Sequence, residues 1–265
     1  MTWTSLSISI RVLSEQPVKL HYATTGSGPI TLLLTHGLAL TGEVWKRQVA
    51  GLAANYRVVT WDLRGHGRSE SPDGTCVLGD LAADLGAILD DAAIAQAVVL
   101  GHSAGSVIAL QFALDYPTRA AGLILVGAAS ECDTAAHRFY EEVAQLPEND
   151  GMEPVRQHLG LRRERDTGSE PNPVTFAKIA RCMGNLHLQP LTPRLHEIRC
   201  PTLVSVGEKD VFGVDPSVVL SRGIAGAHLE IVPGRGHGLF LEDPEGFNHI
   251  VDGFLRRLQS PSHVA

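Results

Sequence analysis

Residues 97–110, AVVLGHSAGSVIAL, decide the fold. The apolar run at 97–100 is typical of a buried strand, and the small and aliphatic residues that follow the turn predict a helix. Between them lies a Gly-x-Ser-x-Gly pattern that starts at Gly101 and ends at Gly105. A turn this tight leaves almost no room for side chains two positions before and after the serine, and glycine meets that need. We therefore expect Ser103 to project from a strained turn into a cleft, above the positive end of the helix.

A pattern of five residues can also be a simple turn, so the interpretation depends on the partners of the serine. A serine nucleophile needs a base to take its proton, and in strand–turn–helix sites of this type an acid and then a histidine follow it in the chain. Asp210 comes shortly after the strand expected at 202–206, and His237 lies in a glycine-flanked loop after the strand expected at 228–232. The sequence therefore predicts a catalytic triad of Ser103, Asp210 and His237 at one edge of a sheet.

The predicted roles follow from the chemistry of the side chains. His237 is suited to be the base because the unperturbed pKa of imidazole lies near neutrality, and Asp210 would fix its tautomer and stabilise the imidazolium. Among the alternative bases, His36 and His66 precede the serine, and His102 points away from it if the turn is sharp. The alternative acids lie near the same predicted edge: Glu208, Asp215 and Glu131.

Two further segments extend the pattern. Residues 31–38 (TLLLTHGL) predict a strand and a His-Gly loop, and residues 56–69 (YRVVTWDLRGHGRS) predict a strand and an Asp-x-Arg-Gly-x-Gly-x-Ser turn. Together with the Gly-x-Ser-x-Gly turn at Ser103, these motifs resemble those of the α/β-hydrolase superfamily over nearly the whole chain. The resemblance implies an α/β fold with a mostly parallel eight-stranded sheet flanked by helices and a small helical lid. It also implies an oxyanion hole formed by the backbone N–H groups of Leu38 and Ala104.

For the turn at residues 62–69 we favour a structural role over a functional one. Buried polar groups at such turns usually satisfy hydrogen bonds of the fold, so Asp62 and Arg64 are expected to pair with the backbone. The plain alternative for the His-Gly pair at residues 36–37 is a turn that only ends a strand.

The alternation of strands and helices predicts the domain organisation. Strands are expected at 7–12, 18–23, 30–34, 56–61, 97–100, 123–126, 202–206 and 228–232, and helices at 43–54, 78–91, 104–115 and 244–258. The alternation of strands and helices is interrupted between about 129 and 195, where three helices are expected at 134–145, 153–161 and 174–183. We therefore expect residues 1–128 and 196–265 to form the core and 129–195 to form an inserted lid that shapes the pocket. The alternative is an ordinary helical excursion that covers a sheet edge.

Apolar and aromatic side chains near this edge are candidates for a substrate pocket. They are His36, Leu40, Trp45, Phe139, Val143, Phe176, Met183, Val211, Phe212 and Leu239. Most could equally be plain core, and we expect about half of them to touch a ligand. The lid shows no evident basic pair, so a strongly anionic substrate is not indicated, although single arginines could serve: Arg64, Arg138 or Arg181.

Composition excludes several functional classes. The 265 residues are 44% hydrophobic and carry a net charge of −7, without the concentrated basic face that a nucleic-acid partner requires. The four cysteines lack metal-ligand spacing, and no apolar run approaches the roughly 20 residues that span a bilayer. The first residues do not begin a charged-then-apolar pattern, so we expect no signal peptide. We expect a cytoplasmic enzyme, monomeric or homodimeric, that takes a small-molecule substrate, needs no metal or organic cofactor, and binds neither nucleic acid nor membrane.

The predicted reaction is cleavage of a small-molecule carboxylic ester or lactone through an acyl-enzyme. By resemblance, the chain is most similar to the branch that contains enol-lactonases, small-molecule esterases and carbon–carbon bond hydrolases. One alternative is therefore a C–C bond hydrolase of ring-fission products. Another is a ligand-sensing protein on a hydrolase scaffold with little turnover.

Overall fold

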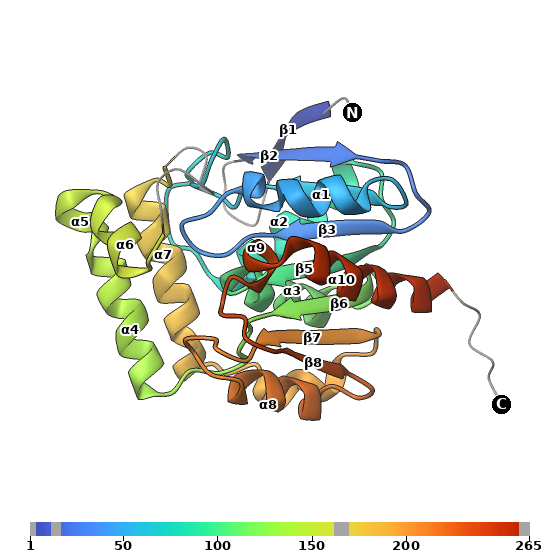
Figure 1. Ribbon diagram of the computed structural model, residues 1–265. Helices are drawn as coiled ribbons and strands as arrows, with labels where there is room; N and C mark the ends of the chain where they lie inside the picture. The colour runs from blue at the N-terminus through green and yellow to red at the C-terminus, as the bar shows by residue number, and fades with distance from the viewer. Residues whose placement is uncertain (1–3, 12–16, 162–169, 260–265) are drawn as a thin grey trace.

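A central sheet organises the molecule. The computed structural model describes residues 4–11, 17–161 and 170–259. The strands of this part of the chain are ordered β1-β2-β4-β3-β5-β6-β7-β8 (Figure 1). The strand β2 pairs antiparallel with both of its neighbours, whereas the remaining pairs are parallel. The strands span Thr4–Arg11 (β1), Pro17–Thr25 (β2), Thr31–Thr35 (β3), Arg57–Trp61 (β4), Ala97–His102 (β5), Ala120–Val126 (β6), Thr202–Gly207 (β7) and His228–Val232 (β8). The predicted α/β-hydrolase fold, with a mostly parallel sheet flanked by helices, is confirmed.

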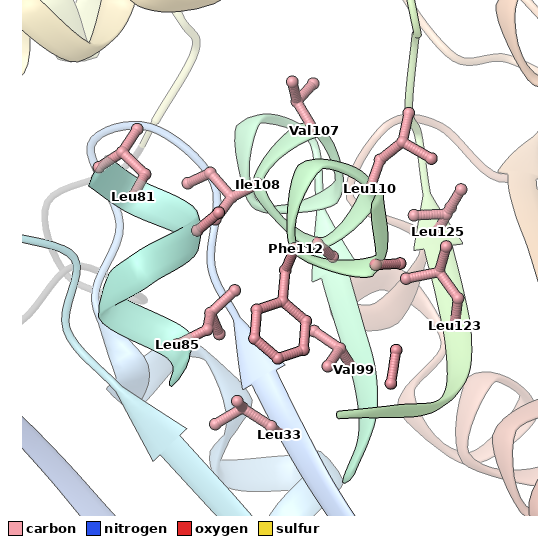
Figure 2. Close-up of a cluster of buried hydrophobic side chains, with 14 of the residues drawn as sticks. Leu33, Leu81, Leu85, Val99, Val107, Ile108, Leu110, Phe112, Leu123 and Leu125 are labelled. Atoms are coloured by element: carbon pink, nitrogen blue, oxygen red, sulfur yellow. The ribbon is translucent and has the colours of Figure 1, made fainter. Parts of the chain in front are cut away.

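The central strands are apolar because helices cover them on both faces. β5 is buried at every position and β3 at four of five. On one face, Leu33 and Val99 meet Leu85 of α2 (Leu78–Asp91) and Phe112 of α3 (Ala104–Asp115), all fully buried (Figure 2). Burying side chains of this size contributes roughly 1.5–3 kcal/mol each. This packing fixes the sheet, and with it the edge at which the parallel strands end.

The opposite face has its own layer of helices. It is formed by α1 (Lys46–Leu52), α9 (Leu239–Glu242) and α10 (Pro244–Gln259), which share a second buried cluster with the sheet. In Figure 1 α1 and α10 lie in front of the strands. α8 (Asp215–Gly223) lies on the first face, where Leu220 joins the same buried cluster, and it packs against β7 and β8. The three-layer arrangement leaves the carboxyl edge of the sheet to the loops.

A helical block lies beyond that edge, at the left of Figure 1. It comprises α4 (Thr134–Gln145), α5 (Pro147–Asp150), α6 (Glu153–His158) and α7 (Pro173–Gly184), followed by the 3-10 turns η2 (Asn185–His187) and η3 (Thr192–Glu197). α4 and α7 pack through a cluster of their own that includes Val143 and Phe176. Side-chain caps begin both helices: Asp133 accepts from the Ala136 N–H, and Asn172 accepts from the Thr175 N–H. The boundaries at 129 and 195 and the role of the block as a lid stay predictions.

Some predicted elements differ from the structure. The helix expected at 43–54 is divided into η1 (Gly42–Trp45) and α1, because the backbone at Trp45 leaves the helical region (ψ 4°) where its indole packs against Phe240. α8 was not predicted, since only two of its nine residues are buried and its apolar repeat is correspondingly weak. β1 begins three residues earlier than expected, and its expected last residue, 12, lies outside the described residues.

Candidate active site

The turn after β5 has the geometry that the sequence predicts. Ser103 adopts φ 54° and ψ −121°, a backbone conformation that residues other than glycine rarely take. A Cβ at Gly101 would collide with the Gly105 carbonyl, and a Cβ at Gly105 would collide with the carbonyl of Thr35. The backbone segments approach each other so closely that only glycine fits at both positions, and the turn holds the serine at the start of α3.

A histidine and an aspartate meet next to this turn. His237 Nδ1 lies 2.8 Å from Asp210 Oδ2, while Asp210 Oδ1 accepts the N–H of Phe212 at 2.9 Å. The Asp210 side chain is 1% exposed and that of His237 is 22% exposed. Because the carboxylate accepts from Nδ1, the proton of a neutral imidazole sits on that nitrogen and Nε2 is left as the basic atom. The pair therefore has the form of a base and the group that orients it.

The end of β6 brings the two parts together. The N–H of Ser103 donates to the carbonyl of Val126 at 2.9 Å. At the next residue, Gly127, a Cβ would lie 3.0 Å from the His237 ring and 3.1 Å from Asp210 Oδ2. Glycine thus makes room for the imidazole beside the serine turn. Gly127 is not among the residues predicted from the sequence, where its signal is a glycine directly after an apolar strand.

Ser103 and Asp210 line one cavity of about 500 Å³. The hydroxyl of Ser103 makes no hydrogen bond within the described part of the chain, so the contact between Ser103 and His237 is not closed in this structure. Catalytic hydrogen bonds are often long in ligand-free enzymes and tighten when substrate binds. Ser103 and Asp210 therefore line one space, and His237 is attached to it through Asp210, with one of the two expected hydrogen bonds formed.

The two backbone groups expected to form the oxyanion hole flank the same serine. Ala104 is the first residue of α3, so its N–H lies at the positive end of the helix dipole. Leu38 follows Gly37, where a Cβ would lie 3.2 Å from the Cβ of Ser103. Within the described residues neither N–H has a hydrogen-bond partner. Both groups are available to an oxygen bound beside Ser103.

The cavity lining differs from the predicted pocket. Of the ten candidate pocket residues, Phe139 and Phe212 line it, with rings 5.7 Å apart in an edge-to-face arrangement. Seven of the other eight are buried in the core clusters or, for the histidine, in a polar network: His36, Leu40, Trp45, Val143, Phe176, Met183 and Leu239. Val211 is 79% exposed and also outside the lining. The lining residues that the sequence analysis did not select include Val107, Ala128, Tyr140, Leu186 and Val219.

The three alternative bases are buried, and burial lowers the pKa of each. His36 Nδ1 lies 2.8 Å from the Gly37 carbonyl, and its Nε2 accepts the Leu63 N–H at 3.0 Å. The pKa of His66 falls to about 3. His102 donates from Nε2 to the carbonyl of His237 at 3.0 Å and stays neutral. It therefore supports the loop that carries His237.

The alternative acids have other partners or places. Glu208 accepts the N–H of Gly234 at 2.8 Å. Asp215 begins α8, and Glu131 follows β6; both line the cavity. In the described structure the carboxylate that pairs with His237 is that of Asp210.

The turn at residues 62–69 is bound into the fold. Asp62 accepts the N–H groups of Gly42 at 2.7 Å and Arg68 at 3.0 Å. Burial alone would raise its pKa, but these bonds and His21 lower it below the usual value. Arg64 was expected to pair with the backbone, and it donates to the Asp80 carbonyl at 3.2 Å. It also forms two shorter hydrogen bonds, of 2.8 and 2.7 Å, with the buried carboxylate of Asp84. Its guanidinium is thus committed to this ion pair.

Two features of the described residues bear on other kinds of site. No group of three or more His, Cys, Asp or Glu side chains in this part of the chain is arranged to hold a metal ion. Among the described helices, none is long and apolar enough to cross a membrane.

Comparisons with known proteins agree with this geometry. A family model described as the alpha/beta hydrolase family matches residues 32–250. The chain is 29% identical to 3-oxoadipate enol-lactonase 2 of Acinetobacter baylyi, over 92% of this chain and 96% of that protein. It is 33% identical to a Rhizobium rhizogenes protein provisionally named carbamate hydrolase RutD, over 85% and 92%. A thermophilic esterase from Thermogutta terrifontis has a TM-score of 0.86 and 26% identity, over 97% of this chain and all of that one.

Proposed function

Because the chain belongs to the alpha/beta hydrolase family, we propose that it is a serine hydrolase that cleaves a small-molecule carboxylic ester or lactone through an acyl-enzyme. The observation that carries the proposal is the 2.8 Å contact between His237 and Asp210 beside a cavity lined by Ser103. The names of three relatives refer to an enol-lactone, a carbamate and an ester, each of which contains a carbonyl that a nucleophile can attack, and this supports the proposed class of reaction.

In the proposed mechanism, Ser103 Oγ attacks the substrate carbonyl carbon while His237 Nε2 takes the hydroxyl proton. The imidazolium then gives that proton to the leaving alcohol oxygen, and the acyl group remains on the serine. A water molecule attacks the acyl-enzyme with His237 again as base, which releases the acid and restores Ser103. Asp210 stays ionised and stabilises the imidazolium in both steps.

The oxyanion of each tetrahedral intermediate would be held by the N–H groups of Leu38 and Ala104. Both are fixed by backbone structure and lack other partners in the described residues, so little reorganisation is needed when charge develops. A donor of this kind is typically worth about 3 kcal/mol of transition-state stabilisation.

The helical block would act as the lid of this site. Phe139 and Tyr140 of α4 line the cavity, so the block supplies one wall of the space in which the acyl group would bind. Excluding water there strengthens the interactions that hold the oxyanion. This role is supported by the position of α4 and goes beyond the family match.

The test uses wild type and Ser103→Ala with p-nitrophenyl esters, lactones and a vinylogous diketone. We expect wild type to hydrolyse esters or lactones and to react with a fluorophosphonate probe, and Ser103→Ala to lose both, by at least about 10³-fold in kcat. Ser130→Ala is the matched control, because Ser130 lines the same cavity but pairs with Thr192 at 2.8 Å. A folded wild type that is not labelled would contradict the proposal, and turnover of the diketone alone would assign the site to C–C bond cleavage.

A further inference from the structure

The cavity beside Ser103 carries negative charge that no positive charge balances. Its described lining contains no lysine, arginine or histidine. It does contain four carboxyl groups, those of Glu131, Asp133, Asp210 and Asp215. Asp210 is paired with His237. In the described part of the chain the other three form no ion pair. A substrate in this cavity therefore meets three uncompensated carboxylates.

These carboxylates line the same cavity and come from two separate segments of the chain. Glu131 and Asp133 precede α4, and Asp215 begins α8. The loop before Glu131 is held by the Ser130 carbonyl, which accepts the N–H of Leu191 at 2.7 Å. Asp133 caps α4 through the Ala136 N–H at 2.7 Å. The charges therefore stay at the wall of the cavity in which the acyl group would bind.

We propose that this cavity selects the substrate by charge: it favours acyl groups that end in an ammonium group, accepts neutral ones and discriminates against those that end in a carboxylate. This inference rests on the proposed function and specifies its substrate class. All three side chains are exposed, so solvent and salt weaken the interaction of each carboxylate with a charge on the substrate. Each therefore changes the relative rate by about threefold rather than by orders of magnitude. Together they would separate neutral from anionic substrates by about thirtyfold at low salt.

The experiment compares three p-nitrophenyl esters of equal chain length: hexanoate, 6-aminohexanoate and the monoester of adipate. For wild type we expect kcat/KM to fall in the order aminohexanoate, hexanoate, adipate. Glu131→Gln, Asp133→Asn and Asp215→Asn keep the side-chain shape, and asparagine keeps the cap of α4. Each should reduce the hexanoate-to-adipate ratio about threefold, and the triple variant should bring it near unity. About 0.5 M salt should reduce the wild-type ratio in the same direction.

Asp90→Asn is the control for overall charge. It removes one negative charge from a side chain that is 70% exposed in the last turn of α2 and outside the cavity, so it should leave the ratio unchanged. Equal kcat/KM for the three esters in wild type, or a triple variant that keeps the wild-type ratio, overturns the inference. Failure of wild type to hydrolyse hexanoate, or equal hydrolysis by Ser103→Ala, contradicts the proposed function instead.

Discussion

The turn at residues 62–69 and the candidate active site use the same types of side chain at the same edge of the sheet. In the turn, Asp62 binds two backbone N–H groups, and Ser69 Oγ donates to the Asp62 carbonyl at 2.6 Å and accepts the His21 N–H at 2.9 Å. His66 Nδ1 lies 3.1 Å from the Arg64 carbonyl. All of these residues are buried.

The candidate active site differs in where its unpaired groups lie. The turn leaves His66 Nε2 without a partner in the described residues, but that atom is buried and outside the cavity lining. Only the Asp210–His237 contact is closed, while the Ser103 hydroxyl and the N–H groups of Leu38 and Ala104 have no partner in the described residues. A hydrogen bond that is already made holds a structure together, whereas an unpaired group at a cavity can act on a substrate. The comparison teaches that residue type does not separate a structural cluster from a reactive one; free hydrogen-bonding capacity next to a cavity does.

The largest effect on the reactive side is expected for Asp210→Asn. The amide cannot stabilise the imidazolium and can favour the wrong tautomer of His237, so kcat should fall about 10³–10⁴-fold while the fold is kept. Glu208→Gln is the matched control, because Glu208 lies two residues away and binds the Gly234 N–H. Steady-state kinetics of both variants test this, and a larger loss for Glu208→Gln than for Asp210→Asn would move the acid to Glu208.

On the structural side, Arg64→Met should have the largest effect on stability. It leaves the Asp84 carboxylate buried without its partner, which typically costs about 3–5 kcal/mol in the free energy of unfolding. Arg64→Met combined with Asp84→Leu removes both charges and should recover most of that loss. Urea denaturation measures the three proteins. If the double variant were as unstable as the single one, packing around Arg64 rather than its charge would explain the loss.

Much of this comparison could be predicted from the sequence, for a geometric reason. Parallel strands end at one edge, so the loops after β5, β7 and β8 had to meet there, and the glycines around Ser103 marked the turn that needed close backbone approach. The pocket could not be predicted in the same way. Whether Phe139 or Val143 of α4 faces the cavity depends on how α4 packs on α7, and that packing buries Val143 in the block's own cluster.

Asp62→Asn should give a smaller and pH-dependent loss of stability. The variant keeps one acceptor for the N–H groups of Gly42 and Arg68 but loses the charge, at a cost of about 2 kcal/mol at neutral pH. The pKa of Asp62 is lowered in the folded protein, so its carboxylate stabilises the fold above the unfolded value near about 4 and ceases to do so as the pH falls through the folded value. Urea denaturation at neutral pH and at about pH 3 should therefore show the gap between wild type and variant narrowing in acid. A gap that widens in acid would mean that the carboxylate does not stabilise the turn.

The smallest effect on stability, and the most direct comparison of the two regions, comes from a pair of serine-to-alanine changes. Ser69→Ala removes the donor to the Asp62 carbonyl and the acceptor of the His21 N–H, so the free energy of unfolding should fall by about 1 kcal/mol with kcat unchanged. Ser103→Ala should do the reverse, because its hydroxyl makes no hydrogen bond in the described structure and its removal costs little stability. Measuring thermal unfolding and ester turnover for both variants separates the two roles. If Ser69→Ala lowered kcat as strongly as Ser103→Ala while leaving stability intact, the turn at residues 62–69 would belong to the catalytic machinery, and free hydrogen-bonding capacity would no longer distinguish the two regions.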